Sequence, residues 1–260
     1  MPEALEAELY RRSAEATIGR PVVGVDVDAR QEMASEIRAV LSGRSVTKAR
    51  RHGKLVLLDL SAPDGEGPTL GLHFGMTGRL VVDGGAAIER LEYASGRDDP
   101  AWDRLVVTFA DGGTLRVNDP RRWARFVLEP DTSRLGPDVL TLTAGELDAA
   151  LAGRRAALKA TLLDQSRIAG FGNLCVDEVL WQAGLSPLRP ASSLGSGERE
   201  RLLVATTRHL PAMLAQGGSH RGTISPDVRA ALPPCALDGA PLERSTVGGR
   251  TTVWCRSHQV

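Results

Sequence analysis

The sequence predicts an α+β protein: an N-terminal helix and a β-sandwich, then a helical domain and a C-terminal β-hairpin. Three observations predict this order. Short strand-like runs fill the chain to about residue 130, helical periodicity follows from Thr141 to about Ala215, and a hairpin pattern lies between Cys235 and His258. We expect domains at 1–130, 131–231 and 232–260 of the 260-residue chain, which is long enough to bury a full core.

The composition is that of a globular protein, with 42% hydrophobic and 25% charged residues. No apolar run has the length of a membrane span and the N-terminus lacks a signal-peptide pattern, so we expect a cytoplasmic protein with no membrane partner. Three cysteines do not make a disulfide framework. The 32 basic and 32 acidic residues argue against a nucleic-acid partner unless the basic residues gather on one face.

The first helix begins with Pro2 and Glu3 and has an apolar face through Leu5 and Leu9. Removal of Met1 would leave a proline amine, and an α-amino group with a pKa of about 8 is far more often neutral and nucleophilic at pH 7 than a lysine. Glu3 beside it is placed to act as a general acid or base. The alternative is ordinary helix-start chemistry, in which proline and acidic residues occupy the first turn.

Six strands are expected in the sandwich, at 22–28, 55–60, 70–74, 79–83, 104–110 and 114–119. A basic run from Lys48 to Lys54 precedes the second of them, and Lys54 stands at its start. Such a run is typical of a solvated face. It is also a candidate for contact with phosphate.

Two turns in the sandwich carry unusual residues. The turn HFGMTG places Met76 between glycines, and NDPRRW places Arg121 close to Trp123. A methionine in a loop commonly packs into a core, and arginine–aromatic pairs are common on surfaces. The same groups also wedge into base stacks or fill gaps in DNA.

The stretch LKATLLDQSRIAGFGNLCVDEVLWQAGLSP, residues 158–187, predicts two helices joined by a Gly-x-Gly-Asn turn, with Asn173 as the N-cap of the second helix. A glycine-flanked helix N-terminus suits a phosphate, and an ordinary helical hairpin is the alternative. The segment from Gly217 to Pro234 reads as a loop.

The tail has Cys235 and Asp238 on one side of a hairpin and Cys255 and His258 on the other, with Gly248 and Gly249 at the tip. Two close pairs flanking a short hairpin are the plan of a zinc ribbon. Histidine is an ordinary zinc ligand and aspartate a rarer one, so structural Zn²⁺ and a metal-free hairpin both stay open.

Taken together in this order, the motifs resemble the formamidopyrimidine-DNA glycosylases and endonuclease VIII enzymes of base-excision repair. The resemblance covers nearly the whole chain. It implies a helix-two-turn-helix motif in the helical domain and a monomeric, bacterial, nucleoid-associated enzyme. Its partner would be double-stranded DNA that contains damaged bases or abasic sites.

The resemblance also implies roles for individual residues. Pro2 would form a Schiff base at C1′, Glu3 would move the proton at the ribose ring, and elimination would nick the strand. Lys54 and Arg250 match residues that hold phosphates beside the lesion, and Met76, Arg121 and Trp123 match residues that fill the space left by the flipped nucleotide. Further DNA contacts would come from Arg154, Arg155, Lys159 and Asn173.

Several positions depart from the family pattern, namely Leu5, Ala124, Cys175, Asp238 and His258. The segment before Cys235 is also short for a member that carries a lesion-binding loop. The HFGMTG and DPRRW turns favour oxidised purines such as 8-oxoguanine and formamidopyrimidines. The short segment equally suits an enzyme for oxidised pyrimidines or abasic sites, and a catalytically idle protein that only binds damaged DNA is a further alternative.

Overall fold

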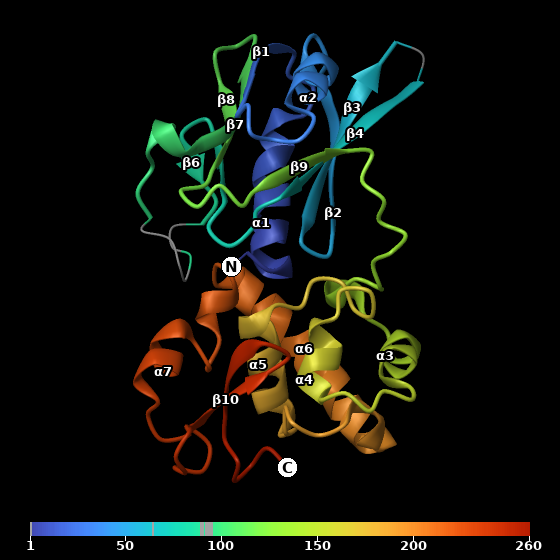
Figure 1. Ribbon diagram of the computed structural model, residues 1–260, viewed down its shortest axis with the longest axis vertical. Helices are drawn as coiled ribbons and strands as arrows, with labels where there is room; N and C mark the ends of the chain where they lie inside the picture. Colours follow the sequence, from blue (N-terminus) through green and yellow to red (C-terminus); the bar gives the residue numbers. More distant parts are fainter. Residues whose placement is uncertain (1, 64, 89–90, 92–95) are drawn as a thin grey trace. The chain divides into compact units, whose positions relative to one another are not determined.

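The computed structural model describes residues 2–63, 65–88, 91 and 96–260 (Figure 1). Met1, whose removal is expected above, lies outside this range. The chain divides into two compact units. One contains Pro2 and Glu6–Thr132, and the other contains Glu3–Leu5 and Ser133–Val260.

The first unit is a β-sandwich with one long helix. Helix α1 spans Ala4–Ala14 and is followed by the short 3₁₀ turn η1, Glu15–Thr17. The five-stranded sheet has the order β1-β7-β8-β5-β6, and the four-stranded sheet has the order β2-β3-β4-β9. The first sheet consists of β1 (Val22–Val27), β7 (Asp103–Phe109), β8 (Thr114–Asn118), β5 (Arg79–Val82) and β6 (Gly85–Ala86). The second consists of β2 (Val46–His52), β3 (Leu55–Ala62), β4 (Gly65–His73) and β9 (Arg125–Leu128).

The core of this unit lies between the sheets, where Figure 1 shows α1. Tyr10 of α1 is fully buried, and its ring centroid lies 4.4 Å from that of Phe74. Its hydroxyl donates to the carbonyl oxygen of Gly78 at 3.0 Å, so the buried phenol is satisfied. Burial of these rings fixes the turn after β4 against α1.

The expected β-sandwich is confirmed, and each of the six predicted strands is present. The sequence missed β2, β9, the two-residue β6 and helix α2, Ala34–Leu41. Strand β2 is the basic run itself. Its charged side chains leave too few apolar positions for an alternating pattern, and pairing with β3 rather than its own sequence makes it a strand.

The second unit is helical and ends in a hairpin. Its helices are α3 (Ala144–Leu151), α4 (Leu158–Leu163), α5 (Asn173–Ala183), α6 (Ser196–Ala215) and α7 (Pro226–Ala231), with 3₁₀ turns η3 (Val139–Thr141), η4 (Ala191–Ser193) and η5 (Ser219–Arg221). Strands β10 (Glu243–Val247) and β11 (Arg250–Trp254) form the predicted hairpin around Gly248 and Gly249. Helix α3 begins with a capping box between Thr143 and Glu146.

The prediction of a loop from Gly217 to Pro234 is wrong for part of that segment, because it contains η5 and α7. Ser225 caps α7 by accepting the N–H of Val228, and Pro226 is the first helical residue. A serine followed by proline is a recognised helix start, so the signal was present in the sequence.

No helix in the described part of the chain combines the length and the apolar character that crossing a membrane requires.

Candidate functional site

The N-terminus of α5 holds the carboxylate of Glu3. The backbone N–H groups of Gly172 and Cys175 donate to Oε2 at 3.0 Å each, and that of Leu174 donates to Oε1 at 2.8 Å. The first N–H groups of a helix lack partners within the helix and carry partial positive charge. Glu3 satisfies three such donors, and its side chain is buried.

Close packing explains the glycine at the turn. A Cβ added at Gly172 would lie 2.2 Å from Cδ of Glu3, so a side chain there would displace the carboxylate. The N–H of Ala4 also donates to the carbonyl oxygen of Gly170 at 3.1 Å. The Gly-x-Gly turn is therefore shaped to receive the residues that follow Pro2.

This arrangement corrects two predictions. The helix N-terminus that the sequence offered to a phosphate is taken by the carboxylate of Glu3. The N-cap of α5 is Gly172, and Asn173 is the first helical residue. Asn173 is half-buried, and its side-chain oxygen is buried without a hydrogen-bond partner among the described residues. A flip of the amide would place its NH₂ group, a donor, at this position in place of the oxygen.

Lys159 was expected to contact a phosphate, and its burial does not fit that role. Its side chain has no exposed surface, and its Nζ lies 2.6 Å from Oδ1 of Asp177 in an ion pair. It also donates to the carbonyl oxygen of Thr251 at 3.1 Å. Burial lowers the pKa of Lys159, while the charge of Asp177 opposes that shift.

Asp119 joins the two turns that carry the predicted gap-filling residues. Its carboxylate is fully buried and accepts the hydroxyl of Thr77 and the N–H of Arg121, at 3.1 Å, on one oxygen. The other oxygen accepts the N–H groups of Trp123 at 2.6 Å and Ala124 at 2.7 Å. One carboxylate thus fixes the HFGMTG turn against the NDPRRW turn.

The two turns are in direct contact. A Cβ added at Gly75, whose φ is +58°, would lie 2.8 Å from the backbone carbon of Trp123. Trp123 is 51% exposed, which is unusual for so large an apolar side chain. The guanidinium carbon of Arg121 lies 5.6 Å from the centroid of its ring. With the half-buried Met76 on the neighbouring turn, these side chains form a partly exposed cluster.

Lys54 lies in the turn between β2 and β3, directly before the strand, and is half-buried. The end of β4 pairs with this region through Leu55 and His73. The N–H of Gly75 donates to Nδ1 of His73 at 3.2 Å, which requires that nitrogen to be unprotonated. Burial, followed by the charges of Lys54 and Arg125, lowers the pKa of His73.

The His73 shift predicts a pH effect. A histidine whose pKa is lowered on folding takes up its proton more readily in the unfolded chain, so it favours the folded state fully above pH about 6.5 and progressively less as pH falls. We expect the free energy of unfolding to decrease between pH 7 and pH 5, and His73→Gln to flatten that slope. Urea unfolding across this range measures both, and equal slopes in the two proteins would refute the assignment.

The remaining predicted contact residues lie at the surface of the second unit. Arg250 is exposed at the first position of β11, after Gly248 and Gly249, whose φ values of +57° and +71° make the tight turn. Arg154 is half-buried and Arg155 is exposed in the segment before α4.

Four residues of the tail form a compact donor set, as the sequence predicted. One ligand atom from each of Cys235, Asp238, Cys255 and His258 lies within 4.8 Å of the others. Sγ of Cys235 is 3.4 Å from Nδ1 of His258, and Sγ of Cys255 is 3.4 Å from Oδ2 of Asp238. Nε2 of His258 lies 3.1 Å from the carbonyl oxygen of Trp181, which leaves Nδ1 facing the cluster. The cluster can hold a metal ion.

Sequence reasoning missed Asp119, Asp177 and Arg229 as structural supports of these sites. Asp119 was visible only as part of the NDPRRW motif. Asp177 is 2% exposed and lies between the apolar residues Val176 and Val179 of α5, next to the equally buried Glu178; acidic residues among apolar ones were the available signal.

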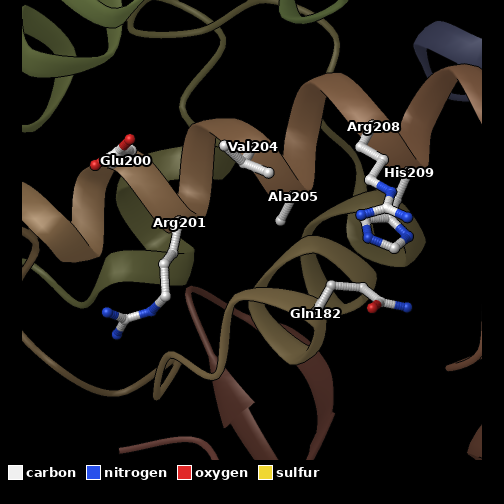
Figure 2. Close-up of a pocket in the computed structure, with 7 residues that line it drawn as sticks. All are labelled: Gln182, Glu200, Arg201, Val204, Ala205, Arg208 and His209. Atoms are coloured by element: carbon white, nitrogen blue, oxygen red, sulfur yellow. The ribbon is translucent and has the colours of Figure 1, made fainter.

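A recess of about 330 Å³ lies away from all of these groups, between the last turn of α5 and the middle of α6. Figure 2 shows α6 crossing it, with Arg201 toward one end and Arg208 and His209 toward the other. None of the residues that line it belongs to the predicted site.

Comparison with known proteins places this geometry in a family. The model of the formamidopyrimidine-DNA glycosylase N-terminal domain matches residues 1–126, and that of the formamidopyrimidine-DNA glycosylase H2TH domain matches residues 135–224. A formamidopyrimidine-DNA glycosylase from Xanthomonas campestris pv. campestris (strain 8004) is 33% identical over 284 residues, with all of both chains covered. The chain belongs to the formamidopyrimidine-DNA glycosylase family. It is an enzyme of the DNA glycosylase class.

Other relatives agree. The formamidopyrimidine-DNA glycosylase of Xanthomonas axonopodis pv. citri (strain 306) is also 33% identical over the whole of both chains. Among solved structures, a complex of wild-type Lactococcus lactis Fpg (MutM) with DNA containing N7-benzyl-Fapy-dG matches with a TM-score of 0.83 at 22% identity, over 99% of each chain. A complex of the same L. lactis protein with DNA containing an oxidised pyrimidine matches with a TM-score of 0.82, also at 22% identity and 99% coverage. These structures support the glycosylase fold of the chain.

Proposed function

We propose that this glycosylase excises oxidised bases from double-stranded DNA and then nicks the strand as an AP lyase, with the amine of Pro2 as nucleophile. The observation that carries the proposal is the fixed carboxylate of Glu3, directly after Pro2 in the chain and held by three N–H groups at the start of α5. Family membership supports the same chemistry.

After removal of Met1, the secondary amine of Pro2 attacks C1′ of the damaged nucleotide, and the bond from C1′ to the base breaks; the base leaves as an anion and takes a proton from water. The carboxylate of Glu3 accepts the proton of the attacking amine and passes it to the ring oxygen O4′ as the C1′–O4′ bond breaks, which opens the sugar and leaves an iminium ion. Loss of a proton from C2′ then expels the 3′ phosphate by β-elimination, and water hydrolyses the iminium to release the enzyme.

We further propose that oxidised purines, such as 8-oxoguanine and formamidopyrimidines, are the preferred lesions. The joined turns that carry Met76, Arg121 and Trp123 support this preference, because their partly exposed side chains suit the gap left by a flipped nucleotide. The names of the curated relatives point to the same class. An oxidised-pyrimidine or abasic-site preference is the alternative.

Borohydride trapping tests the mechanism. Borohydride reduces an iminium to a stable amine, so wild-type protein incubated with duplexes carrying 8-oxoguanine, an oxidised pyrimidine or an abasic site should form a covalent protein–DNA adduct. Pro2→Gly should reduce the adduct to background, because it removes the secondary amine. The duplex that gives the most adduct names the substrate class.

Two outcomes would contradict the proposal. Tight binding without an adduct on any duplex would mean a catalytically idle damage-binding protein. An adduct that persists undiminished in Pro2→Gly would assign the amine to another residue, with Lys54 as the first candidate for replacement.

For the DNA-binding surface we propose phosphate contacts by Lys54, Arg154, Arg155, Asn173 and Arg250. Each lysine or arginine that neutralises a phosphate releases counterions, so the affinity falls with salt in proportion to the number of contacts. Basic contact residues on each unit are compatible with an overall formal charge of zero.

Removing one of these contacts should be visible in the salt dependence. We expect Arg250→Ala to weaken binding to duplexes of different sequence by a similar factor and to lower the slope of log K against log salt by about 1. Asn173→Ala should weaken binding with a smaller change of slope, because asparagine is uncharged. Titrations at four salt concentrations measure the slopes, and an unchanged slope for Arg250→Ala would show that Arg250 does not contact phosphate.

We propose structural zinc for the four-residue cluster of the tail. Two thiols, an imidazole and a carboxylate are all zinc ligands, and the separations of 3.4 Å between neighbouring donor atoms suit a tetrahedron with bonds of about 2.0–2.3 Å. Bound zinc would hold the ends of the hairpin together, while Trp181 orients His258 through its carbonyl oxygen.

Elemental analysis measures the metal. We expect close to one zinc per chain in purified protein, and less than about a tenth of that in Cys255→Ala, which removes one of the two thiolates. The surface variant Thr246→Ala, at an exposed position of β10, should retain the metal. A zinc content near zero in the wild-type protein would leave a metal-free hairpin.

The division of the chain at residues 130 and 231 stays a prediction of the sequence pattern. The monomeric state and association with the nucleoid stay predictions of the resemblance.

A further inference from the structure

Asp177 on α5 is the centre of a buried charge cluster. Besides the ion pair with Lys159, its carboxylate forms an ion pair with Arg229 of α7 and accepts the N–H of Val253 at 3.2 Å. Lys159 has no exposed side-chain surface, and that of Arg229 is 7% exposed. The acid is thus shared between two cations and a strand of the hairpin.

Both cations also reach that strand. Nζ of Lys159 and Nη2 of Arg229 donate to the same carbonyl oxygen, that of Thr251, at 3.1 and 2.8 Å. Through Thr251 and Val253, the cluster holds the backbone of β11 at alternate positions. A further guanidinium, that of Arg244 on β10, donates to the carbonyl oxygen of Arg229 at 2.6 Å, so both strands are tied to it.

The charges of the cluster are balanced within the second unit. Lys159 also feels the charge of Glu3, so two buried cations face two buried anions. Buried ions persist only when they are paired and hydrogen-bonded, and removal of one partner leaves another uncompensated. Strand β11 is therefore held by charged groups each of which needs its partner in order to stay buried.

The cluster contacts β11 at Thr251 and Val253, whereas the proposed zinc ligand Cys255 lies just beyond the end of the strand. Arg250 is the neighbour of Thr251, whereas Cys255 follows five residues later, about 16 Å away along an extended strand. At the tip, a Cβ added to Gly248 would lie 3.2 Å from Cβ of Ala160, so the turn rests directly on α4. The contacts nearest to Arg250 are thus those of the charge cluster and of α4.

We propose that Asp177, with Arg229 and Lys159, is a positioning residue that fixes β11 from Thr251 to Val253 and thereby holds Arg250 in position to contact DNA. The role of Arg250 rests on the proposed function. The anchoring of the strand does not, so the two parts are tested separately. The metal cluster, in this assignment, fixes only the far end of the strand.

Hydrogen exchange of full-length protein tests the anchoring. In Asp177→Asn and in Arg229→Gln, we expect the amides of 250–253 to exchange at least about 10-fold faster, with the sandwich strands unchanged. Glu178→Gln is the matched control. Glu178 is an equally buried acid on the same helix, and within the described residues its carboxylate accepts the N–H of Ile224 and the side-chain amide of Gln182. The variant should leave 250–253 protected.

Arg229→Gln keeps the test valid if Asp177→Asn fails to fold, because Arg229 lies at the edge of the cluster. Unchanged protection of 250–253 in Arg229→Gln, or an equal loss in Glu178→Gln, would overturn the proposal. Removal of metal by a chelator from wild-type protein should expose residues 254–258 and spare 250–253. Faster exchange in both segments would mean that the metal cluster, and not the charge cluster, holds the strand in place.

Affinity for a duplex with an abasic-site analogue tests whether the cluster positions Arg250 for contact with DNA. We expect Arg229→Gln and Arg250→Ala each to weaken binding about 10-fold, and the double variant to bind no more weakly than Arg250→Ala alone. Asp177→Asn removes a negative charge, which by itself favours DNA binding, so weaker binding in that variant reports a loss of position and not a loss of positive charge. Additive losses would show that the cluster acts independently of Arg250. If Arg250→Ala binds normally while the exchange result holds, the proposed function of Arg250 fails and the anchoring stands.

Discussion

Replacing Glu3 by glutamine is expected to lower the rate of base excision by about 10²- to 10⁴-fold, the usual contribution of a general acid or base. Glutamine has almost the same size as glutamate, but its NH₂ group cannot accept a hydrogen bond. One of the donors, Gly172, Leu174 or Cys175, would then face another donor. The proton donor and its fixed position are lost together.

Single-turnover excision on the preferred duplex measures the rate, and titration of the same duplex measures the affinity. The affinity should change little, because Glu3 is buried and contacts backbone N–H groups rather than solvent. Glu8→Gln in α1, the helix that begins directly after Glu3, is the control; Glu8 pairs with Arg11 and Arg12, and the variant should retain full activity. A loss of affinity as large as the loss of rate would contradict the catalytic role.

Replacing Asp119 by asparagine should destabilise the first unit by about 3 kcal/mol, which is the range for losing hydrogen bonds to a buried charged acceptor. The carboxylate accepts four donors on its two oxygens. Asparagine would turn one oxygen into a donor opposite the N–H groups of the turn. For a chain of this size the melting temperature should fall by about 6–12 °C.

Excision should fall as well, by about 10²-fold, because misplacement of groups by about 1 Å is costly in an active site. Trp123→Ala provides the contrast. It removes the exposed ring but leaves the hydrogen bonds of Asp119 to the backbone, so activity should fall while the melting temperature stays within about 2 °C. An Asp119→Asn protein that melts like wild type would show that the turns do not depend on the carboxylate.

Much of the fold was predictable because local patterns agree with tertiary packing. The predicted strands of the sandwich are short apolar runs, several of them bounded by turn residues, and the helices on either side of the Gly-x-Gly turn have apolar residues at helical spacing. Prediction failed where the local pattern carries no such signal. Strand β2 is basic, β9 has only four residues, and α2 begins after Met33 in a left-handed conformation with a φ of 59°.

The candidate site also has parts that local sequence patterns predicted and parts that they did not. The sequence predicted the donor set of the tail and the two motif turns, because short-range spacing brings their members close. The sequence predicted that Lys159 and the N-terminus of α5 each bind a phosphate. In the structure each binds a carboxylate of this chain, and those partners depend on residues distant in the sequence. The partner of that N-terminus is Glu3, 169 residues before Gly172, and the carbonyl oxygen that Lys159 reaches is 92 residues away.

The sequence by itself determined the family, the reactive groups available and the elements that carry them, since motif residues and periodicity are local properties of the chain. Only the tertiary structure decided which of those groups are buried partners and which face solvent. A lysine and a helix N-terminus attract any suitable anion. In the folded chain Asp177 pairs with Lys159 and Glu3 pairs with the N-terminus of α5, so neither the lysine nor the helix N-terminus is left at the surface. A buried charge persists only where another segment pairs with it.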